Sequence, residues 1–287
     1  MRFGLFATFM SPRADRHMIK DFAQQCEAIG VDSIWMGEHV VLFDETEHPY
    51  PGSADGKIPV PAGGGMLDTV STFGYMAAVT EKIRFGTGIT LVSQRNPVYT
   101  AKEFTTLDWL SGGRIDFGVG VGWCKEEVLA SGYSWEDRGA RTDEFLQLVK
   151  SFWTDETTEF QGKHFQVDAC HMDPKPLQTP HVPIIVGGHS KPALRRAARF
   201  GNGWYGFQLT PEQTAPIVDQ LHTNLAAEGR PAEDFEIVIT PGKLDDQDIA
   251  AFEALGIKRL VLHLGSQKQE KVAARLSQVE TLINSAA

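Results

Sequence analysis

Residues 84–127, RFGTGITLVSQRNPVYTAKEFTTLDWLSGGRIDFGVGVGWCKEE, predict a strand, a helix and a second strand in succession. Each predicted strand ends in a glycine-rich turn. Glycine at a strand end lets the backbone approach a ligand closely or adopt conformations that are closed to other residues. This stretch therefore predicts both the repeating unit of the fold and the position of a small-molecule site.

The same alternation of strand and helix runs along the whole chain. Eight short apolar runs predict strands at 2–9, 33–36, 83–89, 115–120, 184–187, 203–207, 235–239 and 259–263. Each is followed by residues with helical spacing, for example Met18, Phe22, Cys26 and Ile29 after the first strand. These units predict an α/β fold, a (β/α)8 TIM barrel formed as one domain by residues 1–287. A doubly wound open sheet is the alternative.

Composition excludes several classes of protein. The 287 residues include 27 Lys and Arg against 37 Asp and Glu, a net charge of −10, with no basic run that would bind nucleic acid or an anionic membrane. The N-terminus has no signal-peptide pattern, and no apolar segment approaches about 18 residues, so we expect a cytoplasmic protein. Cys26, Cys124 and Cys170 are odd in number and widely spaced, which argues against a disulfide framework or a zinc ribbon.

Two segments are longer than ordinary connections. Residues 40–67 contain four prolines and three consecutive glycines, and they join the second predicted strand to the second helix. Long loops on that side of a barrel usually cover the active site, so this loop is the predicted lid. Residues 155–182 form an insertion before the fifth strand, and TEFQGKHFQVD within it predicts a small hairpin.

Barrel enzymes place their reactive groups at the carboxyl ends of the strands. The second strand ends in Trp35-Met36-Gly37-Glu38-His39. A histidine at this position can move a proton at neutral pH, which makes His39 the candidate catalytic residue. A structural histidine held by Glu38 is the alternative.

The third and fourth strands both end in glycine. Gly88 stands before Ile89 and Thr90, which predicts a β-bulge beside an active site, although a plain packing glycine also fits. The sequence GVGVGW, which ends at Trp123, differs from the dinucleotide fingerprint in its spacing and lacks the required acidic residue. We expect its small residues to let a planar ring lie against the strand ends, with Trp123 at the edge.

The fifth strand leads into Gly187-Gly188-His189-Ser190 and then into a helix that ends before Gly201. Ser190 is a natural N-cap, and the free amides of this turn predict an anion site, with phosphate as the favoured anion and an empty cap as the alternative. Three basic residues add positive potential: Lys191, Arg195 and Arg196.

The sequence contains no convincing metal site. His164, His171, His181 and His189 are irregularly spaced, and neither HxH at a strand end nor HExxH is present. We therefore expect no metal cofactor. A metal-dependent barrel hydrolase or isomerase that uses Glu38, His39 and the histidines of residues 155–182 is kept as an alternative function.

Taken together, segments 29–40, 82–127 and 183–204 resemble the bacterial luciferase-like superfamily of flavin- and deazaflavin-dependent oxidoreductases, and the resemblance covers the chain from Arg2 to about Tyr205. It implies a barrel that binds FMN or the deazaflavin coenzyme F420 at its carboxyl face. It also implies a non-prolyl cis peptide bond from Gly88 to Ile89 behind the ring. The implied cofactor-binding residues are Glu38, Gly88, Ile89, Thr90, Trp123, Gly187, Gly188, His189 and Ser190.

The signatures GVGVGW and RNP are similar to those of a subgroup of F420-dependent oxidoreductases, which favours F420 over FMN. Deazaflavin-dependent sugar-phosphate dehydrogenases of this superfamily carry glutamate where Trp123 stands, so an apolar or aromatic small-molecule substrate is expected instead. The resemblance further implies a homodimer.

The predicted function is hydride transfer or monooxygenation of a small organic substrate, with His39 near the reactive centre of the ring. Two alternatives remain within the family: an FMN-dependent monooxygenase that receives reduced flavin from a partner reductase, and a flavin-binding protein without turnover.

Overall fold

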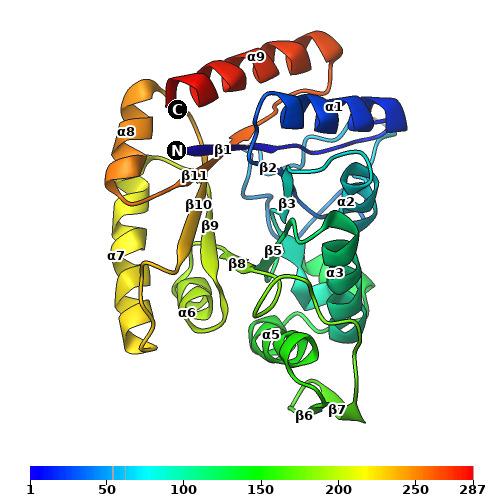
Figure 1. Cartoon of the computed structure of the whole chain (residues 1–287). Coiled ribbons are helices and arrows are strands. Elements are labelled where there is room, and N and C mark those ends of the chain that lie inside the picture. Colours follow the sequence, from blue (N-terminus) through cyan, green and yellow to red (C-terminus); the bar gives the residue numbers. More distant parts are fainter. Residues whose placement is uncertain (54, 62, 287) are drawn as a thin grey trace.

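The computed structural model describes residues 1–53, 55–61 and 63–286, and its centre is a closed barrel of parallel strands surrounded by helices (Figure 1). The hydrogen-bonded strands run in the order β3-β2-β1-β11-β10-β9-β8-β5-β4, and the barrel closes because β3 also pairs with β5. The short β4 continues the third strand and pairs with β5, so the barrel has eight strand positions. The predicted (β/α)8 barrel is confirmed, and the open sheet is wrong.

The barrel strands alternate with helices along the chain. The strands are β1 (Arg2–Phe6), β2 (Ser33–Met36), β3 (Arg84–Thr87), β4 (Thr90–Leu91), β5 (Ile115–Gly120), β8 (Ile184–Gly187), β9 (Gly203–Leu209), β10 (Glu236–Pro241) and β11 (Arg259–His263). The helices are α1 (Arg16–Ala28), α2 (Thr69–Ala77), the 3₁₀ turn η1 (Val92–Gln94), α3 (Pro97–Ser111), α4 (Lys125–Ala130), α5 (Arg138–Thr154), α6 (Lys191–Phe200), α7 (Pro211–Ala227), α8 (Asp246–Ala254) and α9 (Gln269–Ala286).

Capping residues define the helix ends. Asp15 caps α1 by accepting hydrogen bonds from two backbone amides. Asn96 caps α3 in the same way, and the following Pro97 occupies the first helical position, where its missing N–H costs nothing. Gly112 ends α3 in the left-handed conformation that favours glycine.

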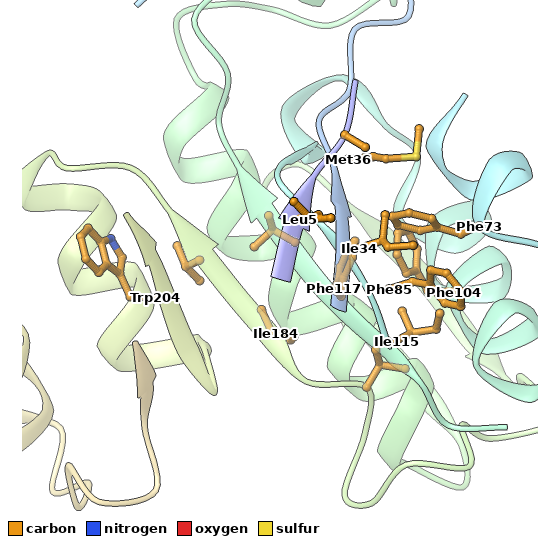
Figure 2. Close-up of a cluster of buried hydrophobic side chains, with 14 of the residues drawn as sticks. Leu5, Ile34, Met36, Phe73, Phe85, Phe104, Ile115, Phe117, Ile184 and Trp204 are labelled. Atoms are coloured by element: carbon orange, nitrogen blue, oxygen red, sulfur yellow. The ribbon is translucent and has the colours of Figure 1, made fainter. Parts of the chain in front are cut away.

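The core has two layers because side chains alternate along each strand. The larger layer lies between the strands and the helices, and Figure 2 shows part of it, including Phe85, Phe104 and Phe117. A smaller cluster fills the inside of the barrel: Trp35, Ile185, Tyr205, Val238 and Val261. Within it the rings of Trp35 and Tyr205 stack with centroids 5.1 Å apart. The inside of the barrel is therefore packed.

Several predicted boundaries change. β1 ends at Phe6 rather than at residue 9, and the predicted third strand, 83–89, stops at Thr87 and resumes as β4. The hairpin predicted within residues 155–182 is present as the antiparallel pair β6 (Thr158–Gln161) and β7 (Gln166–Cys170). The described parts of residues 40–67 form turns and bends without a helix or a strand.

A cluster of buried charges joins the amino ends of the strands. The Arg259 side chain is only 2% exposed, and its guanidinium lies 2.7 Å from Asp116, 3.0 Å from Asp32 and 3.2 Å from Glu236. Arg84 binds the other oxygen of Asp116 at 2.6 Å. Burial opposes the ionisation of Asp116, but the charges of Arg259 and Arg84 outweigh it and hold the pKa of the Asp116 carboxyl below its ordinary value.

At the carboxyl ends, close packing explains why glycines are needed. A Cβ on Gly118 would lie 1.6 Å from the carbonyl oxygen of Thr87. A Cβ on Gly120 would lie 2.7 Å from Ile89 Cγ2, and one on Gly187 would lie 2.6 Å from Ile89 Cδ1. The Ile89 side chain therefore occupies the space that two glycines leave. These glycines accommodate the neighbouring strand. That the small residues of GVGVGW also let a planar ring lie against the strand ends stays a prediction.

We predict that alanine is tolerated very unequally at these glycines. Gly120→Ala should cost about 1–3 kcal/mol of unfolding free energy, because Ile89 Cγ2 moves only with the stiff χ1 of a β-branched residue. Ile89→Ala should recover part of that loss in the double variant. In Gly118→Ala the added Cβ would meet the Thr87 carbonyl, so the loss of unfolding free energy should be larger. Ile89→Ala should not recover any of this loss, because a backbone atom causes it. Urea denaturation measures each value.

The control is Gly74→Ala in α2, where the added Cβ would meet its nearest neighbour at an ordinary 4.0 Å. Because alanine favours helix over glycine, this variant should be neutral or more stable by up to about 1 kcal/mol. Equal losses in the Gly118 and Gly120 variants, or no recovery in the double variant, would contradict the packing described above.

The buried charge cluster gives a second prediction. Arg259→Met leaves the buried Asp116 with Arg84 as its remaining cation and removes the buried partner of Asp32 and Glu236. The loss should be about 3–5 kcal/mol, as is usual when a buried ion pair is broken on one side. Arg2→Met is the matched control, since Arg2 pairs with the same Asp32 and Glu236 but has a side chain that is 45% exposed. It should cost less than about 1 kcal/mol. If the Arg259→Met and Arg2→Met variants unfold at similar urea concentrations, burial of the arginine does not determine how much it stabilises the fold, and the prediction is contradicted.

Candidate active site

A cavity of about 680 Å³ lies at the carboxyl end of the barrel, between the strand ends and the 40–67 loop. This volume is typical of small-molecule sites, which span about 300–1,000 Å³. The cavity wall includes nine of the ten residues that were predicted as site residues: Glu38, His39, Gly88, Ile89, Trp123, Gly187, Gly188, His189 and Ser190. The structure thus brings together residues from the ends of β2, β3, β5 and β8.

Thr90 is the exception. It is buried in β4, only 2% exposed, and pairs with Val119 of β5. Thr90 is not among the residues that line the cavity. The strand resumes after Ile89, and Thr90 is therefore packed in β4. Its predicted cofactor contact stays a prediction.

His39 is held by a residue that the sequence did not indicate. Its Nδ1 lies 2.8 Å from Oε2 of Glu127, a fully buried residue of α4, and Oε1 of the same carboxylate accepts a 2.6 Å hydrogen bond from the Val40 amide. The ring of Trp123 approaches the imidazole edge-on at 5.7 Å, and the ring of Tyr50 at 6.4 Å. His39 is therefore a fixed side chain on the cavity wall. The alternative in which Glu38 holds His39 is wrong.

The carboxylate of Glu38 is hydrogen-bonded to other residues of the protein. It accepts hydrogen bonds from Arg95 Nε at 2.9 Å and from the Leu91 amide at 2.7 Å. Arg95 also donates to Glu103 at 2.9 Å. Glu38 thus joins the end of β2 to the segment after the bulge, and any contact with a cofactor would leave these bonds in place. Arg95 belongs to the RNP signature but was given no role from the sequence.

The bulge at Gly88 and Ile89 forms part of the cavity wall. The Gly88 amide donates to the Met36 carbonyl at 2.7 Å, and a Cβ at Gly88 would lie 3.0 Å from the ring of Phe6. Within the described chain, all cis peptide bonds precede proline. The cis bond implied between Gly88 and Ile89 is therefore wrong, and packing on Phe6 together with the Met36 hydrogen bond shapes the bulge instead.

The glycine-rich turn before α6 is open to the cavity. Gly188, His189 and Ser190 are exposed, and Gly188 has φ of 106°, which favours glycine. Ser190 Oγ accepts a hydrogen bond from the Ala193 amide, so the predicted N-cap is confirmed. The indole N–H of Trp204 donates to the Gly188 carbonyl at 2.8 Å and fixes the turn. Exposed amides at the N-terminus of a helix are suited to bind an anion.

Charge near this turn is limited. Of the three basic residues named above, only Arg196 lines the cavity, and its guanidinium donates to Asp143 and to the Gly139 carbonyl. Lys191 and Arg195 are exposed on the outside of α6. His189 is exposed, but partial desolvation lowers the pKa of its imidazole and favours the neutral form. Backbone amides and the helix dipole are thus the main attraction for an anion.

The 40–67 loop covers the cavity, as predicted for a lid. Its end is tied to the first strand end by the bridge between Met10 and Met66. The side-chain amide of Gln208 donates a 3.2 Å hydrogen bond to the Gly52 carbonyl of the loop. The backbone of Gln208 has φ of 56°, which non-glycine residues seldom adopt. Loop residues that line the cavity are Tyr50, Pro51, Gly52, Ile58, Pro59 and Met66.

Two further observations concern the described chain as a whole. No group of three or more His, Cys, Asp or Glu residues within 1–53, 55–61 and 63–286 is arranged to hold a metal ion. Each helix of this part of the chain is too short or too polar to cross a membrane.

Curated relatives match most of the chain. An uncharacterised protein of Mycobacterium tuberculosis is 29% identical over 83% of this chain and 79% of its own length. An FMNH2-dependent dimethylsulfone monooxygenase of Pseudomonas putida is 32% identical over 56% of this chain and 45% of its own length. An F420-dependent glucose-6-phosphate dehydrogenase of Amycolatopsis mediterranei is 26% identical over 70% of this chain and 57% of its own length.

Solved structures share the fold. A structure of an F420-dependent secondary alcohol dehydrogenase in complex with an F420-acetone adduct superposes with a TM-score of 0.73 at 18% identity, over 91% of this chain and 92% of that chain. The family model of luciferase-like monooxygenases matches residues 1–278, nearly the whole sequence. The chain therefore belongs to the luciferase-like monooxygenase family of flavin- and deazaflavin-dependent oxidoreductases.

Proposed function

We propose that this chain binds coenzyme F420 or FMN in the cavity, with the phosphate at Gly187–Ser190 and the ring against the bulge at Gly88 and Ile89. The substrate is a small apolar or aromatic molecule, and His39 exchanges a proton with it. F420 is the first choice, because the GVGVGW and RNP signatures resemble those of the F420-dependent subgroup. The curated relatives do not decide: the F420-dependent one matches more of this chain, 70% against 56%, and the FMNH2-dependent one is more similar, 32% identical against 26%.

One observation carries the proposal: the order of three features around the barrel. His39 follows β2, the bulge interrupts the third strand, and the exposed turn before α6 follows β8. The wall between the histidine and the anion site is therefore formed by the bulge and by Trp123. A molecule with a phosphate at one end and a planar ring at the other can reach both ends of this cavity.

The residues present fit such a cofactor. The exposed turn at Gly188–Ser190 offers backbone to a phosphate, and Ile89 offers an apolar side chain to a ring. Within the described chain, the indole N–H of Trp123 is buried at the cavity wall without a hydrogen-bond partner. A buried donor of this kind is normally satisfied, so a bound ligand with an acceptor would explain it. When bound, the ring would supply hydride or, as reduced flavin, activate oxygen.

The protein would contribute positioning, exclusion of water and proton transfer. The loop residues over the mouth, among them Tyr50 and Ile58, shield the site from solvent. His39 is held by Glu127 and lies on the wall, where it can give or take the proton that accompanies oxidation or reduction of the substrate.

The wall around His39 favours an uncharged substrate. The rings of Tyr50 and Trp123 lie beside His39, and Ile58, Pro59 and Met66 of the loop add apolar side chains to the cavity wall. The Glu38 carboxylate is already paired with Arg95. A charged substrate would lose its hydration here without gaining a counter-ion.

Three expectations from the sequence stay predictions. They are a homodimer, a reductase that delivers reduced flavin if FMN is the cofactor, and a place in the cytoplasm.

Parallel titration with F420 and FMN, followed by fluorescence, tests the cofactor. We expect saturable binding of at least one, weakened about tenfold or more by Gly188→Ala, because a side chain is strained at this φ and the turn must shift. Gly229→Ala is the matched control, since Gly229 is also left-handed, with φ of 66° and no atom near its Cβ position. Tight binding of neither cofactor by the wild-type protein would refute the proposal.

Replacement of His39 tests the catalytic role. His39→Ala should lower turnover by about a hundredfold or more while cofactor affinity changes little, because the imidazole acts on the substrate proton rather than on the phosphate. The assay uses small alcohols, ketones and sulfones with the cofactor that binds. His222→Ala, an exposed histidine of α7, is the control. Undiminished turnover in the His39 variant would return His39 to a structural role.

A further inference from the structure

We infer that Glu127 is a positioning residue that decides which nitrogen of His39 carries the proton. The inference rests on the proposed role of His39 in the cavity. Its starting point is a carboxylate that is fully buried and has both oxygens engaged, Oε2 with His39 Nδ1 at 2.8 Å and Oε1 with the Val40 amide at 2.6 Å.

An ionised carboxylate can only accept hydrogen bonds. The proton of a neutral His39 must therefore stand on Nδ1 and point at Glu127. Nε2 is then the nitrogen with a free lone pair, and it is the one left for a molecule in the cavity, since the ring lines the cavity and Nδ1 is occupied. In this state His39 is ready to accept a proton from substrate, and Glu127 stabilises the imidazolium that results.

Glu127 also connects this histidine to the lid. Val40 is the first residue of the 40–67 loop, and the two residues before Glu127 hold the same loop further along. Lys125 Nζ lies 2.6 Å from the Glu47 carboxylate, and the Glu126 carboxylate accepts from the Glu47 amide at 2.8 Å. One turn of α4 thus fixes the start of the lid and the imidazole together.

The Val40 amide makes the effect of Glu127→Gln predictable. Because Val40 N–H needs an acceptor, the glutamine carbonyl must face Val40, which leaves the glutamine NH2 facing His39 Nδ1. An NH2 group donates, so Nδ1 must become the acceptor and the proton must move to Nε2. The substitution therefore changes the tautomer of His39 with almost no change in shape.

The test is nitrogen-15 NMR of histidine-labelled protein without cofactor, with His39→Gln to identify the His39 signals. In the wild-type protein Nε2 of neutral His39 should be the unprotonated nitrogen. In Glu127→Gln the unprotonated nitrogen should be Nδ1. Glu126→Gln makes the same chemical change one residue away and should give the wild-type pattern.

If Glu127→Gln does not fold, the wild-type spectrum alone still tests the inference. A neutral His39 with its proton on Nε2 in the wild-type protein would overturn it. A folded Glu127→Gln protein with the wild-type tautomer would overturn it as well. Both outcomes can occur while F420 or FMN still binds, so this inference can fail independently of the proposed function.

Kinetics give a second readout once a substrate is found. Glu127→Gln should lower kcat by about a hundredfold or more, since the analogous change in enzymes with a carboxylate-oriented histidine lowers kcat by about 10⁴-fold. KM and cofactor affinity should stay within about threefold, because the shape of the site is kept. A fall in cofactor affinity equal to the fall in kcat would show a merely structural role and would contradict the inference.

Discussion

The close approach of the third barrel strand to the fourth is the constraint on which the site depends. β3 and β5 pair at Phe85 and Gly86, and pairing resumes only at Thr90, after the bulge. The bulge fits because Gly118 leaves room for the Thr87 carbonyl and because Gly120 leaves room for Ile89. As a result, Gly88 and Ile89 project into the cavity as a firm wall, with Phe6 packed behind them.

Charges in and around the cavity are nearly all paired within the protein. Glu38 is bound by Arg95, Arg196 by Asp143, and Glu127 by hydrogen-bond donors on residues 39 and 40. Each pair joins segments far apart in the sequence, so these groups stiffen the cavity and add little net charge to it. The polarity left for ligands comes from backbone and from uncharged side chains, among them Trp123, Tyr50, Gln213 and the free nitrogen of His39, which suits a substrate without charge.

The sequence was sufficient for the fold and for most of the cavity wall, because both follow from local patterns. Alternating apolar runs predict the barrel, and the strand ends Glu38-His39, Gly88-Ile89 and Gly187–Ser190 must then lie at one face. It was not sufficient for Glu127 or Arg95, since a carboxylate 88 positions from its histidine leaves no local pattern. The burial of Thr90 in β4 was not predictable for a similar reason, as the length of the bulge depends on packing against Gly118 and Gly120.

The stacked Trp35 and Tyr205 rings have a consequence for the order in which ligands enter and leave. Tyr205 lines the cavity and Trp35 packs against it inside the barrel, so the described cavity ends on this pair and does not continue toward the Arg259 cluster. The stacked pair therefore closes the cavity on the side of the barrel interior, and ligands pass on the other side, where residues of the 40–67 loop line the cavity. If a cofactor lay against the stacked pair with a substrate above it, the cofactor would have to bind first and leave last, and movement of that loop could limit the rate of a whole cycle.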